Sequence, residues 1–302
     1  MNWRKYLTSP PPTTCWVVDG DLVAVLRRES KGGVLWAAES APGGFEVGPV
    51  GLQSVDRGKL AAVVSSLQPR IEGATRVAVV LPSAWTRSYL LEFDDLPRGQ
   101  SDIDQVVQWR LKKLLPVSPA EMRISSLPLQ RSDGSRPLLC MAAIERAIAE
   151  IEGAFSDIGI VPGSIVNRAF ALAGTRTEEN RLLVQQEDGF LTLLLSVGDV
   201  PRLLRTKPLA SSMEPGHTIR QELNLALGFV REKLHIAGDL GVQVSADSRE
   251  IVGEIEDWRS TQSGLKRSPG PPVPEFNQGG AADRLGASRI EAAFSVIAEA
   301  TP

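Results

Sequence analysis

The chain is 302 residues long. This exceeds the ~100 to 200 residues of a typical domain, so two lobes or one large α/β unit are expected. Its 33 basic and 36 acidic residues give a formal charge of −3, which excludes a global attraction to nucleic acid or anionic lipid. No window approaches the ~18 apolar residues of a spanning helix, and two buried-type cysteines predict reduced thiols. These features predict a cytoplasmic protein without a transmembrane segment.

The chain opens with a predicted three-stranded meander. Cys15–Arg28 is expected to form two short strands that turn at Asp19-Gly20-Asp21, and a third strand is expected over Val34–Glu39. A helix is then expected over Lys59–Leu67. This order is typical of the start of an α/β lobe.

Two apolar runs come next, separated by the turn-forming Pro82 and Ser83. The valine-rich run Arg76–Leu81 predicts a buried strand, and Arg87–Phe93 predicts a second one. A hairpin-like pair is the simplest arrangement of two neighbouring strands.

A helix is expected after this pair. Ser101 precedes Asp104 by three residues, which indicates a capping box, and Pro116 forbids continuation of the helix. The predicted buried face contains Ile103, Val107, Leu111 and Leu114, and the predicted solvated face contains Asp104, Gln108 and Lys112.

The rest of the chain predicts a second meander with helices. A strand over Pro137–Ala143 leads into a helix over Glu145–Ile158 that ends at Gly159. Three strands are then expected over Asn180–Gln186, Phe190–Val197 and Pro201–Leu209, followed by a helix with Ile219, Leu223, Leu227 and Val230 on one face, a strand over Val242–Ser245, a helix over Ser248–Trp258 and a closing helix over Ala287–Ala300. The opening order of elements is therefore repeated.

The order of elements over residues 77–131, together with the segment Trp109–Pro116 (WRLKKLLP), resembles the type IV pilus assembly protein PilM family. It is also similar to the cytoplasmic domain of the GspL family of type II secretion. The resemblance implies an α/β, actin-like (ribonuclease H-like, duplicated) two-lobed fold. The first lobe would cover 1–160, with an inserted subdomain around 77–135, and the second 161–302, with a flexible Pro- and Gly-rich loop at 263–283.

The resemblance also implies a nucleotide site built from two hairpins. Their remnants would be Asp19, Gly20 and Asp21 in the first hairpin and Asp188 and Gly189 in the second. Leu22 and Val23 stand where the family has small and hydroxyl residues, Gln185 and Gln186 replace its Asp-x-Gly, and GVQVSADS (241–248) lacks its late glycine pair. Bulky residues remove the space and N–H donors that phosphate needs.

Two interpretations of these departures remain open. The first is a degenerate pseudo-ATPase without a cofactor, in which both Asp-Gly pairs are ordinary turns. The alternative is an actin-like ATPase that binds ATP and Mg²⁺ in the same machinery.

Other chemistry finds little support in the sequence. Gly51–Leu60 has the wrong glycine spacing for a P-loop, and His217 and His235 are too far apart to form a metal pair on one helix. Asp94 and Asp95 precede Leu-Pro and predict a solvated turn.

The resemblance therefore favours an interaction protein. It implies a scaffold, peripheral at the cytoplasmic face of the inner membrane, that grips the N-terminal peptide of a PilN-like bitopic protein in a groove between lobes. Cytoplasmic pilus ATPases are a second implied class of partner. The predicted partner surface consists of Trp85, Trp109, Arg110, Lys113, Leu115 and Pro116. The alternative is that both tryptophans are core residues and the cations form a solvated helix end.

Overall fold

The computed structural model describes residues 12–29, 33–71, 76–93, 96–97, 99–129, 136–173, 180–198, 200–209, 215–236, 239–246, 248–270 and 286–297. The chain divides into two compact units, here named the first unit (residues 12–167) and the second unit (from residue 168). Each has its own sheet and hydrophobic core.

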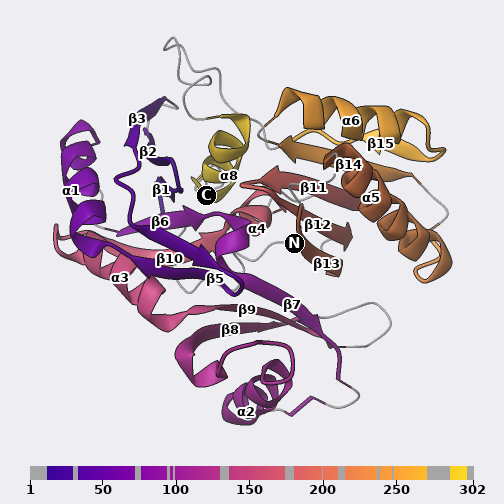
Figure 1. Ribbon diagram of the computed structural model, residues 1–302, viewed down its shortest axis with the longest axis horizontal. Coiled ribbons are helices and arrows are strands. Elements are labelled where there is room, and N and C mark those ends of the chain that lie inside the picture. Colours follow the sequence, from indigo (N-terminus) through magenta and orange to yellow (C-terminus); the bar gives the residue numbers. More distant parts are fainter. Residues whose placement is uncertain are drawn as a thin grey trace. The chain divides into compact units, whose positions relative to one another are not determined.

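The main sheet of the first unit has the strand order β10-β6-β1-β2-β3 (Figure 1). Its strands are β1 (Thr14–Val18), β2 (Leu22–Arg28), β3 (Val34–Ser40), β6 (Arg76–Leu81) and β10 (Val161–Asn167). The first three form the predicted antiparallel meander, which is confirmed, and β6 and β10 add to it in parallel.

The predicted hairpin between the two apolar runs is wrong. Both runs are strands, but β6 lies between β1 and β10, and β7 (Arg87–Leu91) pairs with a strand of another sheet. The reason is burial. Five of the six residues of β6 are buried, a continuous apolar run that suits a central strand covered on both faces.

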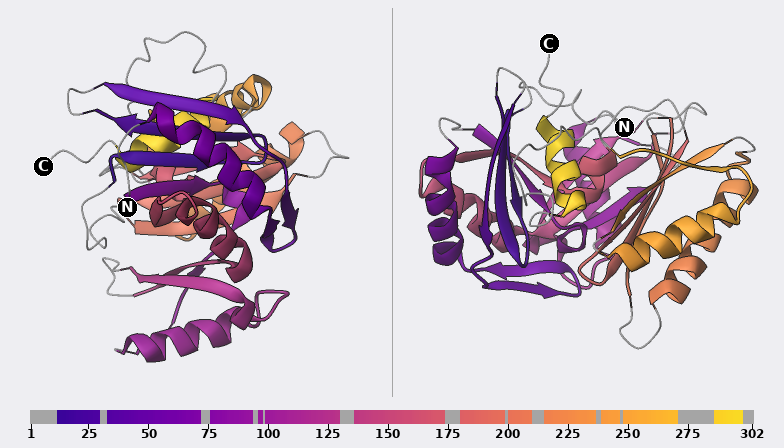
Figure 2. Two further views of the ribbon diagram at one scale, coloured as in Figure 1. Left: turned by 90° about the vertical axis from the view of Figure 1, so that its left-hand side faces the viewer. Right: turned by 90° about the horizontal axis from the view of Figure 1, so that it is seen from above.

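A smaller antiparallel sheet is inserted between β6 and β10. Its order is β7-β9-β8, with β8 at Met122–Pro128 and β9 at Leu138–Ile144. Figures 1 and 2 show α2 (Gln100–Leu111) on one side of this small sheet and α3 (Glu145–Ser156) on the other.

The helix α2 differs from its prediction in two details. It begins after Gly99, whose position has no side-chain cap, so the predicted capping box is wrong. Ile103, Val107 and Leu111 are buried as predicted, but Leu114 is 48% exposed and Leu115 only 7%. The chain leaves the helix after residue 111, and the subsequent turn delivers Leu115 to the core.

Two further helices complete the first unit. The predicted helices are confirmed as α1 (Arg57–Leu67), capped by the Asp56 side chain, and α3. The latter ends as predicted at Gly159, whose φ of 77° allows the Ile160 N–H to donate to the Phe155 carbonyl. A hairpin of β4 (Phe45–Gly48) and β5 (Gly51–Val55) was not predicted.

The sheet of the second unit has the order β13-β12-β11-β14-β15. Its elements are α4 (Arg168–Ala173), β11 (Arg181–Glu187), β12 (Phe190–Val197), β13 (Val200–Pro208), α5 (Pro215–Glu232), β14 (Leu240–Ala246), α6 (Arg249–Ser260), β15 (Leu265–Arg267) and α8 (Ala287–Ile297). The predicted meander, strand and helices are confirmed. Part of the predicted loop 263–283 forms β15, and its residues 271–283 lie outside the described residues.

The two sheets have the same topology. In each, the first strand is central, two antiparallel strands follow on one side, and two parallel strands complete the other side. The fifth strand of the first sheet is β10, so the first unit ends at Asn167, seven residues beyond the predicted boundary at 160. The inserted layer, predicted around 77–135, extends from β7 to the end of β9 at Ile144.

Candidate functional site

A groove of about 230 Å³ opens within the first unit, between the small sheet, α3 and β10. It is named the β10 groove here. Its walls come from Arg123 and Ser125 on β8, Met141 to Ala143 on β9, Ile148 and Glu152 on α3, and Pro162 to Asn167 on β10, with Thr86 before β7.

The small sheet divides its two faces between a core and the groove. On β8, Met122 and Ile124 belong to the hydrophobic cluster shared with α2, whereas Arg123 and Ser125 line the groove. Successive side chains of a strand point to opposite faces, so this alternation follows from the pleat. The helix α2 thus supports the sheet from behind while the other face remains available.

The groove follows the edge of β10. Six consecutive residues of this strand, Pro162 to Asn167, line it. One face of a strand presents every second residue, so a consecutive run indicates an opening along the backbone edge. In the described part of the chain β10 pairs with β6 alone, which leaves its other edge for a further strand.

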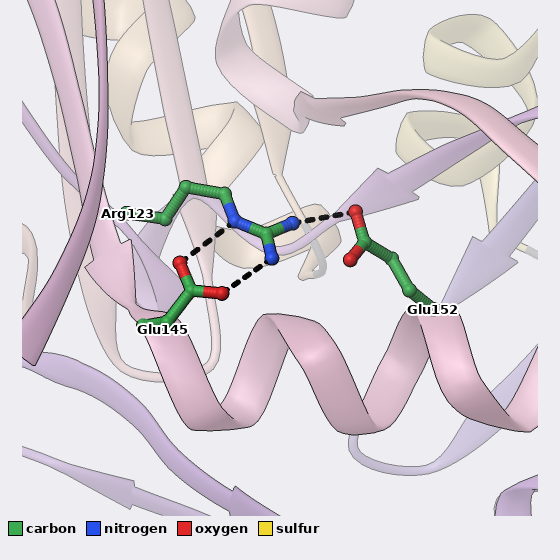
Figure 3. Close-up of polar contacts among 3 residues, drawn as sticks. All are labelled: Arg123, Glu145 and Glu152. Carbon is green, nitrogen blue, oxygen red and sulfur yellow. Dashed lines mark hydrogen bonds and ion pairs between the residues drawn. The ribbon is translucent and has the colours of Figure 1, made fainter.

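A charged cluster lies at the groove wall. Figure 3 shows the Arg123 guanidinium between Glu145 and Glu152, which lie two turns apart on α3. Arg123 Nε and Nη2 donate to the two Glu145 oxygens at 2.9 and 2.5 Å, and Nη1 donates to Glu152 Oε1 at 2.5 Å. These bonds hold the sheet to α3 and fix the orientation of the guanidinium.

The same bonds change the protonation equilibria of the cluster. Hydrogen bonds from Arg123 lower the pKa of Glu145 below its usual value, although partial desolvation opposes the shift. The carboxylates in turn raise the pKa of Arg123. The pair of Arg123 and Glu145 therefore remains charged at neutral pH.

The closed end of the groove is fixed by Asn167. Its buried amide donates to the Ser83 carbonyl at 3.2 Å and to Thr86 Oγ1 at 2.7 Å. These bonds connect the end of β10 to the segment between β6 and β7. The groove wall is thereby preorganised by hydrogen bonds.

The predicted partner surface is not brought together as a whole. Trp85 is 2% exposed and packs against Phe45, with 5.0 Å between ring centroids, and Leu115 belongs to the α2 core. These two side chains are core residues and are not available at the surface. Trp109, Arg110, Lys113 and Pro116 are exposed at the end of α2, where a role in partner binding stays a prediction.

The first predicted phosphate hairpin is a turn closed by its own hydrogen bonds. Asp19 is buried, its N–H donates to the Leu22 carbonyl at 2.9 Å, and the Gly20 N–H donates to the Asp19 carboxylate at 2.8 Å. A phosphate loop needs such N–H groups directed at the ligand. Here the N–H groups of Asp19 and Gly20 both form hydrogen bonds within the turn, and Asp21 is the next residue of the same turn.

The second hairpin has the geometry of an ordinary tight turn. Asp188 and Gly189 have φ angles of 48° and 73°, as a two-residue type I′ turn requires. The neighbouring carboxylate of Glu187 is bound by the Arg168 guanidinium, and both side chains are almost fully buried. The carboxylate next to this turn is therefore already paired with a cation of the protein.

Among the described residues, no other sequence-predicted group lines the groove. Within the described ranges no cluster of three or more His, Cys, Asp or Glu could hold a metal ion, and no helix is long and apolar enough to cross a membrane. His217 and His235 are exposed, and Asp94 and Asp95 lie outside the described residues. Cys15 and Cys140 are free and buried, and burial raises the pKa of both thiols.

Sequence reasoning missed the residues that build the groove. Arg123 and Glu152 carry no motif, and no strand was predicted over Val161–Asn167, a segment interrupted by Pro162 and Gly163. The available signal was the alternation of polar and apolar residues in Met122–Ser125, which is typical of a strand with two different faces.

Comparison with known proteins identifies the fold. No protein-family model and no curated protein matches the chain. A solved structure described as the PilM–PilN type IV pilus biogenesis complex is 15% identical, covers 97% of this chain and 100% of that chain, and has a TM-score of 0.72. At this identity the match shows a shared fold, and it confirms the actin-like fold that the resemblance to PilM implies.

Two further solved structures are more distant. The cytoplasmic domain of EpsL, an inner-membrane component of the type II secretion system of Vibrio cholerae, is 12% identical, with coverage of 85% of this chain and 89% of that chain and a TM-score of 0.49. A Bacteroides thetaiotaomicron protein with an actin-like ATPase fold is 8% identical, with coverage of 88% and 92% and the same TM-score.

Proposed function

We propose that this protein is an assembly adaptor that holds an extended segment of a membrane protein in the β10 groove and does not hydrolyse ATP. The observation that carries the proposal is the run of six consecutive β10 residues along the groove, on a strand whose second edge pairs with none of the described strands. An extended peptide that adds to such an edge gains main-chain hydrogen bonds. The partner we propose is the N-terminal segment of a PilN-like protein.

The dimensions of the strand set the length of the bound segment. β10 has seven residues. At about 3.3 Å per residue a strand of this length spans roughly 23 Å, so six to eight partner residues would pair with it. Main-chain bonds would supply affinity, and the side chains that point into the groove would supply specificity.

The groove wall favours particular side chains in the partner. Ser125 and Ala143 are small and leave space, whereas Arg123 and Glu152 present one charge of each sign. Because Arg123 already has two carboxylate partners, a partner carbonyl or hydroxyl suits the wall better than a strong anion. We therefore expect a polar, weakly charged segment.

The fold match supports the identity of the partner class. The PilM–PilN structure covers nearly all of this chain. An adaptor of this kind would lie at the cytoplasmic face of the inner membrane, where the N-terminal segment of a bitopic partner is located. The same proposal extends in two ways. Cytoplasmic pilus ATPases would be further partners, and the machinery served would be type II secretion instead of pilus assembly.

Binding of synthetic peptides tests the groove. Fluorescence anisotropy would measure the affinity for synthetic N-terminal peptides of PilN-like proteins. Ser125→Trp fills the groove from an exposed position on β8 and should weaken binding at least about tenfold. Ser65→Trp, the same exchange on the exposed surface of α1, is the matched control and should bind like wild type.

Two results would contradict the proposal. Equal affinity of the Ser125→Trp and Ser65→Trp variants would place the peptide elsewhere. No binding by the wild type would remove the adaptor function itself.

The alternative function is an ATPase, because the actin-like fold also occurs in ATPases. A thermal shift with Mg²⁺-ATP separates the two. We expect no shift, because Asp19 and Gly20 use their N–H groups within the turn. A shift of several degrees that Asp19→Ala abolishes would favour the enzyme.

A further inference from the structure

The exposed end of α2 combines apolar and basic side chains. We name Trp109, Arg110, Lys112, Lys113 and Leu114 the α2 patch. Trp109 is 56% exposed, and with Leu114 it provides two of the five most exposed large hydrophobic side chains in the described part of the chain. Isolated exposed apolar residues are common, but two within six residues on one helix end require an explanation.

The charge around these two residues is strongly one-sided. The sequence from residue 105 to residue 120 contains three cations and no Asp or Glu, although the whole chain has a net charge of −3. The acids of α2, Asp102 and Asp104, lie near its other end, and eight residues of helix separate Asp104 from Lys112 by about 12 Å. The patch is therefore a local positive surface on an acidic protein.

The orientation of the patch keeps it away from the core. Ile103, Val107 and Leu111 attach the opposite face of α2 to the small sheet. The patch lies across this sheet from the β10 groove, because α2 and α3 lie on opposite sides of it (Figures 1 and 2). It is thus free for a contact that does not compete with a segment in the groove.

The contacts within the patch hold the aromatic ring at the surface. Lys113 Nζ lies 3.9 Å from the centroid of the Trp109 ring. This cation–π contact covers one face of the ring, and the residue remains 56% exposed. An exposed Trp and Leu surrounded by long basic side chains is the pattern of segments that rest at a lipid interface, where the apolar tips enter the headgroup region and the cations remain at the phosphates.

We propose that the α2 patch contacts the anionic surface of a bilayer. Trp109 and Leu114 would enter the headgroup layer, and Arg110, Lys112 and Lys113 would pair with lipid phosphates. A bilayer fits these residues better than an acidic peptide does, because the patch is the convex end of one helix. Bound peptides use a groove or an open strand edge, and this unit provides that feature on the other side of the small sheet.

The contact is expected to be weak and reversible. Each Lys or Arg near an anionic surface increases partitioning by roughly fivefold, and three act together here. The inference does not rest on the proposed partner, since lipid alone is the ligand. If the adaptor function also holds, tethering by the partner would raise the effective concentration of the patch at the membrane.

Vesicle flotation of the full chain tests the proposal. Vesicles of phosphatidylglycerol and phosphatidylcholine should bind the wild type, whereas phosphatidylcholine alone should bind it at least about tenfold less. Binding should also disappear at 0.5 M salt, where the screening length is only a few ångströms. Binding to neither vesicle, or equally to both, would overturn the proposal.

A matched pair of charge reversals locates the contact. Arg110→Glu with Lys112→Glu changes two exposed residues of the patch, and Arg231→Glu with Lys233→Glu makes the same change at the end of α5. The first variant should lose at least about tenfold in partitioning, and the second less than threefold. An equal loss of partitioning in both variants would show a response to net charge alone. It would overturn the assignment of the lipid contact to the α2 patch.

Fluorescence provides a second readout. Lipids brominated near the headgroup should quench part of the tryptophan emission of the wild type, and Trp109→Phe should remove that quenching while the vesicles still bind. Unchanged quenching in Trp109→Phe would contradict the inference. Binding of an acidic peptide by the patch in place of vesicles would likewise overturn the lipid contact and assign the surface to a protein.

Discussion

The two units share one sheet topology but differ in the connection between the fourth and fifth strands. In the second unit β14 leads through a single helix, α6, to the fifth strand. In the first unit the chain builds β7, α2, β8, β9 and α3 before it returns as β10. The groove is lined by this insertion and by β10, so the candidate site lies where the addition meets the repeated framework.

The fifth strands of the two sheets differ in length. β10 has seven residues, of which six line a groove, whereas β15 has three. Short edge strands limit pairing with further strands, so strand addition is expected at the first sheet and not at the second. The same topological position therefore holds a long edge strand in one unit and a short one in the other.

The largest expected effect is the loss of unfolding free energy when the buried ion pair of the second unit is broken. The ion pairs of the groove cluster in the first unit are more exposed and should matter less. Arg168 and Glu187 of the second unit have side chains that are 1% and 2% exposed. Glu187→Gln breaks this buried pair and should lower the free energy of unfolding by about 3 to 5 kcal/mol. Urea denaturation followed by circular dichroism measures the change. A loss below about 1 kcal/mol would mean that the pair does not stabilise its unit.

A pair of core truncations separates stability from binding. Leu111 in the α2 core and Leu223 in the second unit are both fully buried, and each Leu→Ala change should cost about 2 to 4 kcal/mol. Leu111→Ala removes support from behind the small sheet, so it should also weaken peptide binding, measured by anisotropy on the folded fraction. Equal binding by both variants would show that the groove does not depend on α2.

The units should also respond to pH in opposite directions. In the second unit, partial burial raises the pKa of Glu291 to about 7. The folded state then holds a proton that the unfolded state releases near pH 4.5, so stability falls as the pH rises from about 4.5 to 7. Glu291→Gln should be more stable than wild type at pH 8 by about 1 to 2 kcal/mol, a value reduced for partial solvation.

Thermal unfolding at pH 8 and pH 4 checks this dependence. The stabilisation should disappear at the lower pH, where Glu291 is protonated in both states. A constant difference at the two values would show that the substitution acts through packing.

The smallest expected effect concerns the groove cluster. The lowered pKa of Glu145 means that its ion pair stabilises the fold above the unfolded pKa of 4.5 and ceases to do so as the pH falls through the lower folded value. Because the pair is half exposed, Glu145→Gln should cost under about 1 kcal/mol at pH 7.

A titration of unfolding free energy from pH 7 to pH 3 tests the sign. The difference between Glu145→Gln and wild type should vanish at the acidic end. Glu150→Gln, on the same helix, is the control and should show a smaller difference at pH 7. A larger effect in the control would contradict the assigned role of Glu145.

Local signals in the sequence determined most of the elements. The period of Ile219, Leu223 and Leu227 predicted α5 and its buried face, and Asp188-Gly189 predicted a turn that the positive φ angles confirm. These features depend on residues within a few positions of each other, so neighbouring side chains and backbone preferences are sufficient to specify them.

Tertiary structure alone decided the pairing of strands and the composition of the site. β6 and β7 are neighbours in sequence but belong to different sheets, and Leu115 replaces Leu114 in the core because the chain turns after α2. The groove joins Arg123, Glu152 and β10, which have no local pattern in common. Their meeting depends on which long-range pairing buries the most apolar surface, a balance summed over the whole unit that no short window of sequence contains.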